Sequence, residues 1–154
     1  MPVISIRTAQ QGDEDQLAEL RALLWPDETF EQHRREVQKL IQSGMSGTSA
    51  AAVLVAIDSS EGLAGFLEVG LRSHADGCDV AQTVGYVEGW FVREEFRCRG
   101  IGKQLMKAAE DWSRARNCRE IASDALVDNM ESREAHGALG FEVVDLCVHF
   151  RKGL

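Results

Sequence analysis

The sequence predicts an α/β (α+β) fold, in which helices flank a mixed central sheet. Six segments have the alternation or apolar runs of strands, and four have helical periodicity. Their order along the chain is β-α-α-β-β-β-α-β-α-β. The central strands form a meander, and the helix after them makes a crossover to the next strand. The 154 residues match the commonest domain size, so we expect a single domain over 1–154.

Composition narrows the classes of function. Hydrophobic residues make up 44% of the chain, which supplies a full core and argues against disorder. The formal net charge of −8 disfavours nucleic acid as a partner and suits a cationic substrate, although acidity also serves solubility. No apolar run approaches the roughly 18 residues of a membrane helix, and residues 1–7 lack the features of a signal peptide. We therefore expect a cytoplasmic protein that binds neither nucleic acid nor membrane.

The cysteines and histidines show no spacing that is typical of a metal site. The four cysteines include no Cys-x-x-Cys pair, and we interpret them as free cytosolic thiols. The four histidines include no His-Glu-x-x-His motif. The sequence therefore predicts no metal site.

The N-terminal part predicts a strand and two helices. Residues 3–8 alternate apolar and polar side chains, as in a strand. Residues 13–24 carry four leucines on one helical face, with Asp13 available as the N-cap and Pro26 ending the helix. A second helix is expected over 29–42. Its apolar face is thin, which leaves part of it facing solvent or a cleft.

The remaining elements follow from the same kinds of pattern. Glycine- and serine-rich residues predict a loop over 43–49, polar residues predict another over 72–82, and Gly140 ends the last helix as its C′ residue. The expected elements are strands over 50–57, 63–71 and 84–92, a helix over 102–116, a strand over 120–124, a helix over 129–139 and a strand over 141–150.

The turn between the strand over 84–92 and the helix over 102–116 is the most informative stretch. It is basic and contains Gly100 and Gly102. Free N–H groups and the macrodipole make a helix start attractive to anions, and glycines let a ligand approach the backbone. The turn therefore favours binding of a pyrophosphate, with a capped surface turn as the alternative. Its spacing is neither that of a P-loop nor that of the dinucleotide fingerprint.

The motif Arg97-Cys98-Arg99-Gly100-Ile101-Gly102 resembles the Arg/Gln-x-x-Gly-x-Gly/Ala signature of the GCN5-related N-acetyltransferases. The order of elements matches the fold of that family over nearly the whole chain. The resemblance implies acetyl-CoA as co-substrate, with pantetheine lying along the strand over 84–92 where it splays from the next strand at a bulge. The cofactor contacts that it implies fall on Trp90, Phe91, Val92, Cys98, Arg99, Gly100, Ile101, Gly102, Lys103 and Asn129. Core packing is the alternative for Trp90 to Val92.

A closer resemblance concerns the acceptor. Glu88-Gly89-Trp90-Phe91-Val92, the Ala-Ser-Asp ending at Asp124 and Leu139-Gly140-Phe141-Glu142 are similar to the chromosomal type of aminoglycoside 6'-N-acetyltransferases. Aminoglycosides are polycations, which carboxylates bind through charge-assisted hydrogen bonds. The alternation of strands also predicts that Glu88 shares a face with Trp90. The substrate contacts that the resemblance implies are Trp25, His74, Glu88, Asp124 and Asp145.

Two of these residues have alternative roles. Trp25 is either a platform for a sugar ring or a core anchor before a turn. His74 stands where the resembled group has a tyrosine, in a loop that is one residue shorter.

The predicted chemistry is direct attack of an amine on the thioester, because no cysteine has a paired base. Asp124 or Glu88, through water, would take the ammonium proton. His136 occupies the position of a tyrosine that acts as an acid toward the thiolate in many proteins of this fold. A histidine can donate a proton near neutrality, and a structural hydrogen bond is the alternative.

Three functions compete. The first is an aminoglycoside 6'-N-acetyltransferase, the second an acetyltransferase of a polyamine or peptide amine, and the third a non-catalytic acetyl-CoA-binding module. The acidic pair Glu88 and Asp124 favours the enzymes. A homodimer is common in the resembled group, and the thin face of the helix over 29–42 would allow one.

Overall fold

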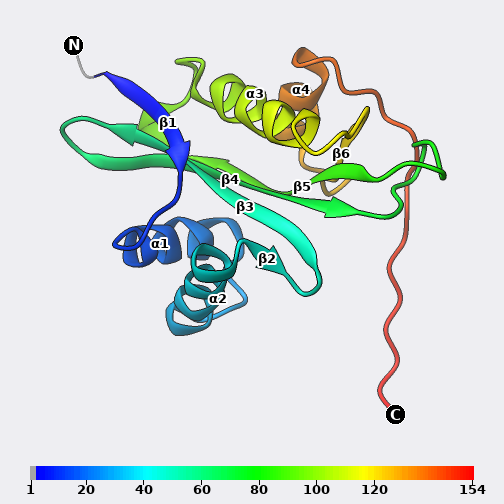
Figure 1. Cartoon of the computed structure of the whole chain (residues 1–154), viewed down its shortest axis with the longest axis horizontal. Coiled ribbons are helices and arrows are strands. Elements are labelled where there is room, and N and C mark those ends of the chain that lie inside the picture. Colours follow the sequence, from blue (N-terminus) through cyan, green and yellow to red (C-terminus); the bar gives the residue numbers. More distant parts are fainter. Residues whose placement is uncertain (1–2) are drawn as a thin grey trace.

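One sheet with helices on both of its faces makes up the protein (Figure 1). The computed structural model describes residues 3–154, so Met1 and Pro2, part of the segment in which we expect no signal peptide, lie outside the described residues. Helices α3 and α4 cover one face of the sheet, and α1 and α2 cover the other. The elements are β1 (Ile4–Thr8), α1 (Glu14–Leu24), α2 (Phe30–Ser43), β2 (Met45–Ser46), β3 (Ser49–Asp58), β4 (Gly62–Arg72), β5 (Val84–Val92), the 3-10 turn η1 (Glu94–Phe96), α3 (Ile101–Arg114), β6 (Ile121–Ser123) and α4 (Met130–Ala138). None of the helices within 3–154 combines the length and the apolar character that crossing a membrane requires.

The sheet is mixed, as the sequence predicts. Its order is β1-β3-β4-β5-β6, with antiparallel pairs from β1 to β5 and a parallel pair between β5 and β6. The parallel pair follows from the crossover through α3. The sequence does not predict β2, a two-residue strand that pairs with the start of β3 inside the expected loop.

Buried apolar side chains fix both helical layers on the sheet. The core between α3 and the sheet contains Leu67, Val87, Ile101, Leu105 and Met106. The core under α1 and α2 contains Leu17, Leu20, Val37, Val55 and Phe66. Each fully buried side chain of this size stabilises the fold by about 1.5–3 kcal/mol. Strand β5 therefore has a firmly packed neighbour on each face.

The start of α1 differs from the prediction. The sequence predicts Asp13 as the cap, but its side chain makes no hydrogen bond to the helix. Asp13 has a helical backbone (φ −87, ψ −9) instead of the extended one of a cap. Its carboxylate accepts hydrogen bonds from Gln10 N at 2.8 Å and from Arg7 Nη1 at 2.6 Å. Helix α2 does begin with a capping box, on Thr29.

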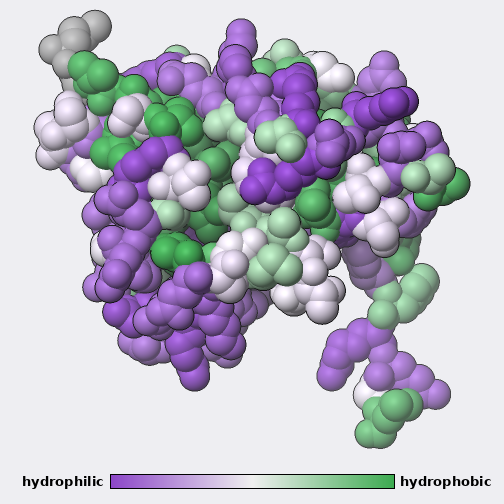
Figure 2. Space-filling model, viewed as in Figure 1, coloured by the Kyte–Doolittle hydropathy of each residue, from purple (hydrophilic) through white to green (hydrophobic). Residues whose placement is uncertain are grey.

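The predicted last strand over 141–150 is wrong. Residues 141–154, which we call the C-terminal arm, have no regular secondary structure and lead away from the body (Figure 1, red). Strands need a paired neighbour, and none of the described strands lies along the arm. Phe141 packs on the core under α3, but the apolar side chains that follow it are exposed, with Val148 at 75% and Phe150 at 93%. Figure 2 shows the end of the arm standing clear of the rest of the surface.

Candidate active site

Strand β5 carries an irregularity at the centre of the site. Gly89 pairs with Glu68 of β4 and the next pair involves Val87, so Glu88 is an extra residue that forms a β-bulge. β5 pairs with β6 only from Gly85 to Val87. Beyond Val87 the two strands part, and none of the described strands pairs with this edge of β5. An extended ligand can therefore bind along it.

The bulge decides where the following side chains lie. Val87 and Trp90 both pack on the core under α3, although they are three residues apart. Glu88 instead lines a hollow of about 200 Å³ together with Glu68 and Leu40 of α2. The prediction that Glu88 and Trp90 share a face is therefore wrong, because the bulge interrupts the alternation of the strand.

The side chains at the end of β5 pack in the two cores. Trp90 and Val92 contact the core under α3, and Phe91 contacts the opposite one. The Trp90 ring lies against the start of α3, since a Cβ built on Gly102 would be 3.1 Å from it. The Val92 carbonyl accepts a hydrogen bond from Arg97 Nε at 2.9 Å. Core packing thus holds for all three side chains, and the backbone of Trp90 and Phe91 remains for a ligand.

The start of α3 presents backbone N–H groups without partners. Its N-cap is Gly100, which has φ +76 and no side chain to cap the helix. Gln104 N donates to Gly100 O, while the N–H groups of Ile101, Gly102 and Lys103 have no partner among the described residues. The first turn has no acidic residue. This helix start therefore suits a phosphate.

The charged side chains of the turn fall into two kinds. Arg97 is tied to the protein, because its Nη1 pairs with Glu131 of α4 at 3.1 Å. Arg99 and Lys103 are exposed and form no ion pair with any described residue, so their charges are available to an anion. Cys98 is exposed in a left-handed conformation (φ +60) and shapes the turn through its backbone.

At the acidic end of the site, four side chains form one polar chain. Tyr86 Oη donates to Asp124 Oδ2 at 2.8 Å. The Arg72 guanidinium lies 3.5 Å from the centroid of the Tyr86 ring and donates to both oxygens of Glu88, at 2.9 and 2.8 Å. Burial and the hydrogen bond to Asp124 raise the pKa of Tyr86, so the phenol keeps its proton.

A groove of about 630 Å³ lies between β6, α4, the loop after β4 and the base of the C-terminal arm. Four of the predicted site residues line it: His74, Asp124, His136 and Asp145. Trp25 does not, because its ring rests on the backbone of β5 at Gly89. Glu88 lies in the smaller hollow. Three of the predicted acceptor residues, His74, Asp124 and Asp145, therefore line the groove, whereas Glu88 lines the hollow. The side chains of Tyr86 and Arg72 connect Asp124 to Glu88.

His136 bridges α4 and β6 where the strands part. Its Nδ1 lies 2.7 Å from the Ser132 carbonyl, which can only accept, so Nδ1 carries the proton and Nε2 accepts from Ser123 Oγ at 2.8 Å. Its ring meets those of Trp90 and Phe141 edge to face, with centroids 5.1 and 5.2 Å apart. The structural hydrogen bonds offered as the alternative role are therefore present.

Comparison with known proteins identifies the family. Residues 17–141 match the family model described as "Acetyltransferase (GNAT) family". The chain belongs to this acetyltransferase family. The aminoglycoside N(6')-acetyltransferase type 1 of Klebsiella aerogenes is 36% identical over 149 residues, which cover 97% of this chain and 96% of the relative. The protein of the same name from Stenotrophomonas maltophilia is 35% identical over 150 residues, covering 97% and 94%.

Solved structures of acetyltransferases have the same fold. AAC(6')-Iy in complex with the bisubstrate analog CoA-S-monomethyl-acetylneamine matches with a TM-score of 0.87 and 31% identity over 99% of each chain. AAC(6')-Ih from Acinetobacter baumannii matches with a TM-score of 0.85 and 30% identity over 99% of each chain. The fold and the family predicted from the sequence are confirmed, and these relatives carry the name of the group that the sequence resembles.

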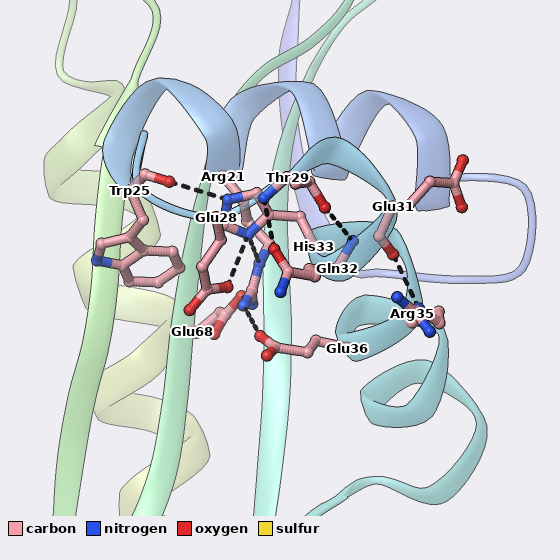
Figure 3. A network of polar contacts seen from close by, with 10 residues as sticks. All are labelled: Arg21, Trp25, Glu28, Thr29, Glu31, Gln32, His33, Arg35, Glu36 and Glu68. Atoms are coloured by element: carbon pink, nitrogen blue, oxygen red, sulfur yellow. Dashed lines mark hydrogen bonds and ion pairs between the residues drawn. The ribbon is translucent and has the colours of Figure 1, made fainter.

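This acetyltransferase has a buried polar network at the end of α1 that the sequence patterns do not predict (Figure 3). Arg21 of α1 donates to Glu68 of β4 and to Glu36 of α2, and its Nε lies 3.3 Å from His33 Nδ1. Arg21 and His33 are buried. One signal was available, because Arg21 follows Leu17 by four residues and so falls on the apolar stripe of the helix.

The same network contains a group of ligand-type atoms that spacing along the sequence does not reveal. Atoms of Glu28, His33 and Glu36 lie within 4.8 Å of one another. The Arg21 guanidinium donates to His33 and Glu36 and so supplies a positive charge there.

Asn129, the remaining predicted contact of this acetyltransferase, caps α4 by accepting from Ser132 N at 3.1 Å.

Proposed function

We propose that this acetyltransferase transfers the acetyl group of acetyl-CoA to the 6'-amino group of aminoglycosides. The parting of β5 from β6 carries the proposal, because the free strand edge lies between the uncapped start of α3 and the carboxylates. Relatives at 35–36% identity are named for this reaction, and AAC(6')-Iy binds an analogue that joins CoA to an aminoglycoside fragment.

The acetyl-CoA half of the site works mainly through backbone atoms. The N–H groups of the first turn of α3, with Arg99 and Lys103, bind the pyrophosphate. Pantetheine pairs with the free edge of β5 at Trp90 and Phe91 as an added strand would. The Asn129 amide group, whose N–H atoms are not needed for the cap, adds a donor.

The acceptor half works through carboxylates. Aminoglycosides are polycations, and charge-assisted hydrogen bonds to carboxylates are roughly twice as strong as neutral ones. The side chains that we assign to the acceptor are Trp25, His74, Glu88, Asp124 and Asp145. Because Arg72 pairs with Glu88, the cationic substrate competes with it for that carboxylate. Binding should weaken as salt rises.

The reaction is a direct transfer without a covalent enzyme intermediate. The neutral amine nitrogen attacks the thioester carbonyl carbon, and the C–S bond breaks as the amide forms. Asp124 or Glu88, through a water molecule, accepts the proton that the nitrogen loses. The CoA thiolate takes up a proton. His136, whose ring lies beside Trp90 at the parting, is our candidate donor in its imidazolium form, in which Nε2 also carries a proton and Ser123 Oγ accepts from it.

Release of CoA thiol tests this function. We expect turnover of acetyl-CoA with kanamycin, and a product heavier than kanamycin by one acetyl group at the 6' position. Turnover with spermidine but not with kanamycin would indicate that the acceptor is a polyamine and not an aminoglycoside. Acetyl-CoA binding without turnover of any acceptor would indicate a non-catalytic module.

We also propose that the chain forms a homodimer through its C-terminal arm. From Val144 to Phe150 every second side chain of the arm is a large apolar one, as on one face of a strand, and these four side chains are exposed. β6 is the last strand of the described sheet, so its outer edge has no paired strand among the described residues. An arm from a second copy would add a strand there and cover its apolar side chains.

Light scattering after gel filtration tests the dimer. The intact chain should elute with twice the monomer mass, and the double variant Val148→Asp/Phe150→Asp should be monomeric. A monomeric intact chain would contradict the proposal.

We further place the enzyme in the cytoplasm, which its four free cysteines support.

A further inference from the structure

The buried network at the end of α1 has no part in the reaction described above. We infer that Arg21 and His33 are positioning residues that hold Trp25 on β5 beside the bulge and thereby set the geometry of the acceptor side. This inference rests on the proposed function, since it concerns aminoglycoside binding at Trp25. The network lies on the α1 and α2 face of the sheet (Figure 3), opposite the face that α3 covers (Figure 1).

His33 fixes the backbone of Trp25. Its Nε2 lies 2.9 Å from the Trp25 carbonyl oxygen, which only accepts, so Nε2 carries the proton and donates. Its Nδ1 then accepts from Arg21 Nε. The imidazole is 0% exposed, so water cannot replace this donor when the ring is removed. His33 therefore determines how the chain leaves α1 at Trp25.

Arg21, His33 and Gly89 fix the Trp25 ring. The Arg21 guanidinium lies 4.8 Å from the ring centroid, and the His33 ring stacks at 6.4 Å. A Cβ on Gly89 would lie 2.4 Å from Cη2 of the indole, so the ring packs directly on the strand. Gly89 follows the bulged Glu88. The Trp25 ring therefore rests on the residue of β5 that follows the acceptor residue Glu88.

Two carboxylates hold the Arg21 guanidinium in place. It donates to Glu68 of β4, which is the residue that pairs with Gly89 across the strands, and to Glu36 of α2. Burial raises the pKa of Glu68 and Arg21 opposes this effect, which makes the pairing of this carboxylate necessary. The planar fork of arginine can bind several acceptors at once, and lysine cannot. Replacement by lysine should therefore loosen Trp25 while keeping the charge.

Fluorine NMR of protein labelled with 5-fluorotryptophan reports on Trp25 directly. The three tryptophans give three resonances, each assigned by its loss in a Trp→Phe variant. In the free enzyme, Arg21→Lys and His33→Leu should shift or broaden the Trp25 resonance and leave those of Trp90 and Trp112 in place. His33→Gln keeps an N–H near the position of Nε2 and should restore the Trp25 resonance.

Kinetics provide the second readout. KM for kanamycin should rise about tenfold in Arg21→Lys and His33→Leu, which corresponds to the free energy of one lost hydrogen bond. In His33→Gln it should return to the wild-type value. KM for acetyl-CoA should stay within about twofold. Arg34→Lys is the matched control, because Arg34 also joins α2 to α1, through Asp15 at 2.7 Å, but on the exposed side.

A Trp25 resonance and a kanamycin KM that do not change in Arg21→Lys and His33→Leu would overturn the inference. So would equal changes at all three tryptophans with equal losses for both substrates, because these indicate general destabilisation. If His33→Leu does not fold, Arg21→Lys against Arg34→Lys decides by the same readouts. A wild-type enzyme that leaves kanamycin unmodified would refute the proposed function, whereas the resonances of the free enzyme test the network independently.

Discussion

The two halves of the proposed active site are built from different parts of the polypeptide. The acetyl-CoA half consists of a bulged strand edge and a helix start, where the backbone supplies the groups and Gly100 supplies the conformation. The acceptor half consists of ionised side chains that other side chains hold, such as Asp124 by Tyr86 and Glu88 by Arg72. None of the side chains that we assign to the acceptor belongs to the acetyl-CoA half. Substitutions should therefore affect the two substrates separately.

The largest effect should come from Gly102→Asp, in the acetyl-CoA half. The new side chain would press on the Trp90 ring, since a Cβ there lies 3.1 Å from it, and would put a negative charge beside the phosphate site. We expect the Kd for acetyl-CoA to rise at least about a hundredfold, which corresponds to about 2.7 kcal/mol. Calorimetric titration measures it. Gly102→Ala, with the bulk but not the charge, should lose less, and an unchanged Kd in Gly102→Asp would remove the phosphate site from the account.

A smaller effect is expected from Asp124→Asn, in the acceptor half. Loss of a charge-assisted hydrogen bond costs about 1.5–3 kcal/mol, so kcat/KM for kanamycin should fall roughly ten- to a hundredfold. The Kd for acetyl-CoA should not change, and the dependence of KM on salt should weaken. Asp128→Asn is the control, because Asp128 is exposed in the same loop. Equal losses for both substrates in Asp124→Asn would mean that the residue is structural and that the halves are not separate.

The smallest effect concerns the support of Asp124. Tyr86 is the only tyrosine, so phenolate absorbance reports on it alone. Burial and Asp124 raise its pKa, so the folded protein should show no phenolate at the ordinary pKa of about 10. The stability from this phenol is present below that pKa and is lost as pH rises through the folded-state value. Asp124→Asn should lower the pKa, and a native titration near 10 in both proteins would contradict the hydrogen bond.

The same contrast explains what the sequence could predict. The acetyl-CoA half depends on a turn of a few consecutive residues, so Gly100, Gly102 and the basic side chains are visible in the sequence itself. Hydrophobic periodicity also gave the mixed sheet and, apart from β2, the order of elements as far as α4. The face on which Glu88 lies could not be predicted, because only the register against β4 shows that this residue is unpaired in a bulge.

The supports of the acceptor half depend on contacts between distant segments. Arg72 and Tyr86 lie 14 residues apart and meet only because β4 and β5 are paired. Arg21, His33 and Glu68 come from three elements, and only the position of Arg21 on an apolar stripe hinted at burial. The predicted strand over 141–150 is wrong for the opposite reason. Its alternation is typical of a strand, but strand formation requires a neighbour that the described chain does not supply.

A crystal structure with both coenzyme A and kanamycin bound tests the central claim most directly, namely that the two substrates meet where β5 parts from β6. We expect the pyrophosphate on the N–H groups at the start of α3 and the sulfur beside the free edge of β5. The 6'-nitrogen should face that sulfur, within reach of Asp124 or Glu88 directly or through one water. Coenzyme A bound away from α3, or kanamycin bound away from both carboxylates, would contradict the account.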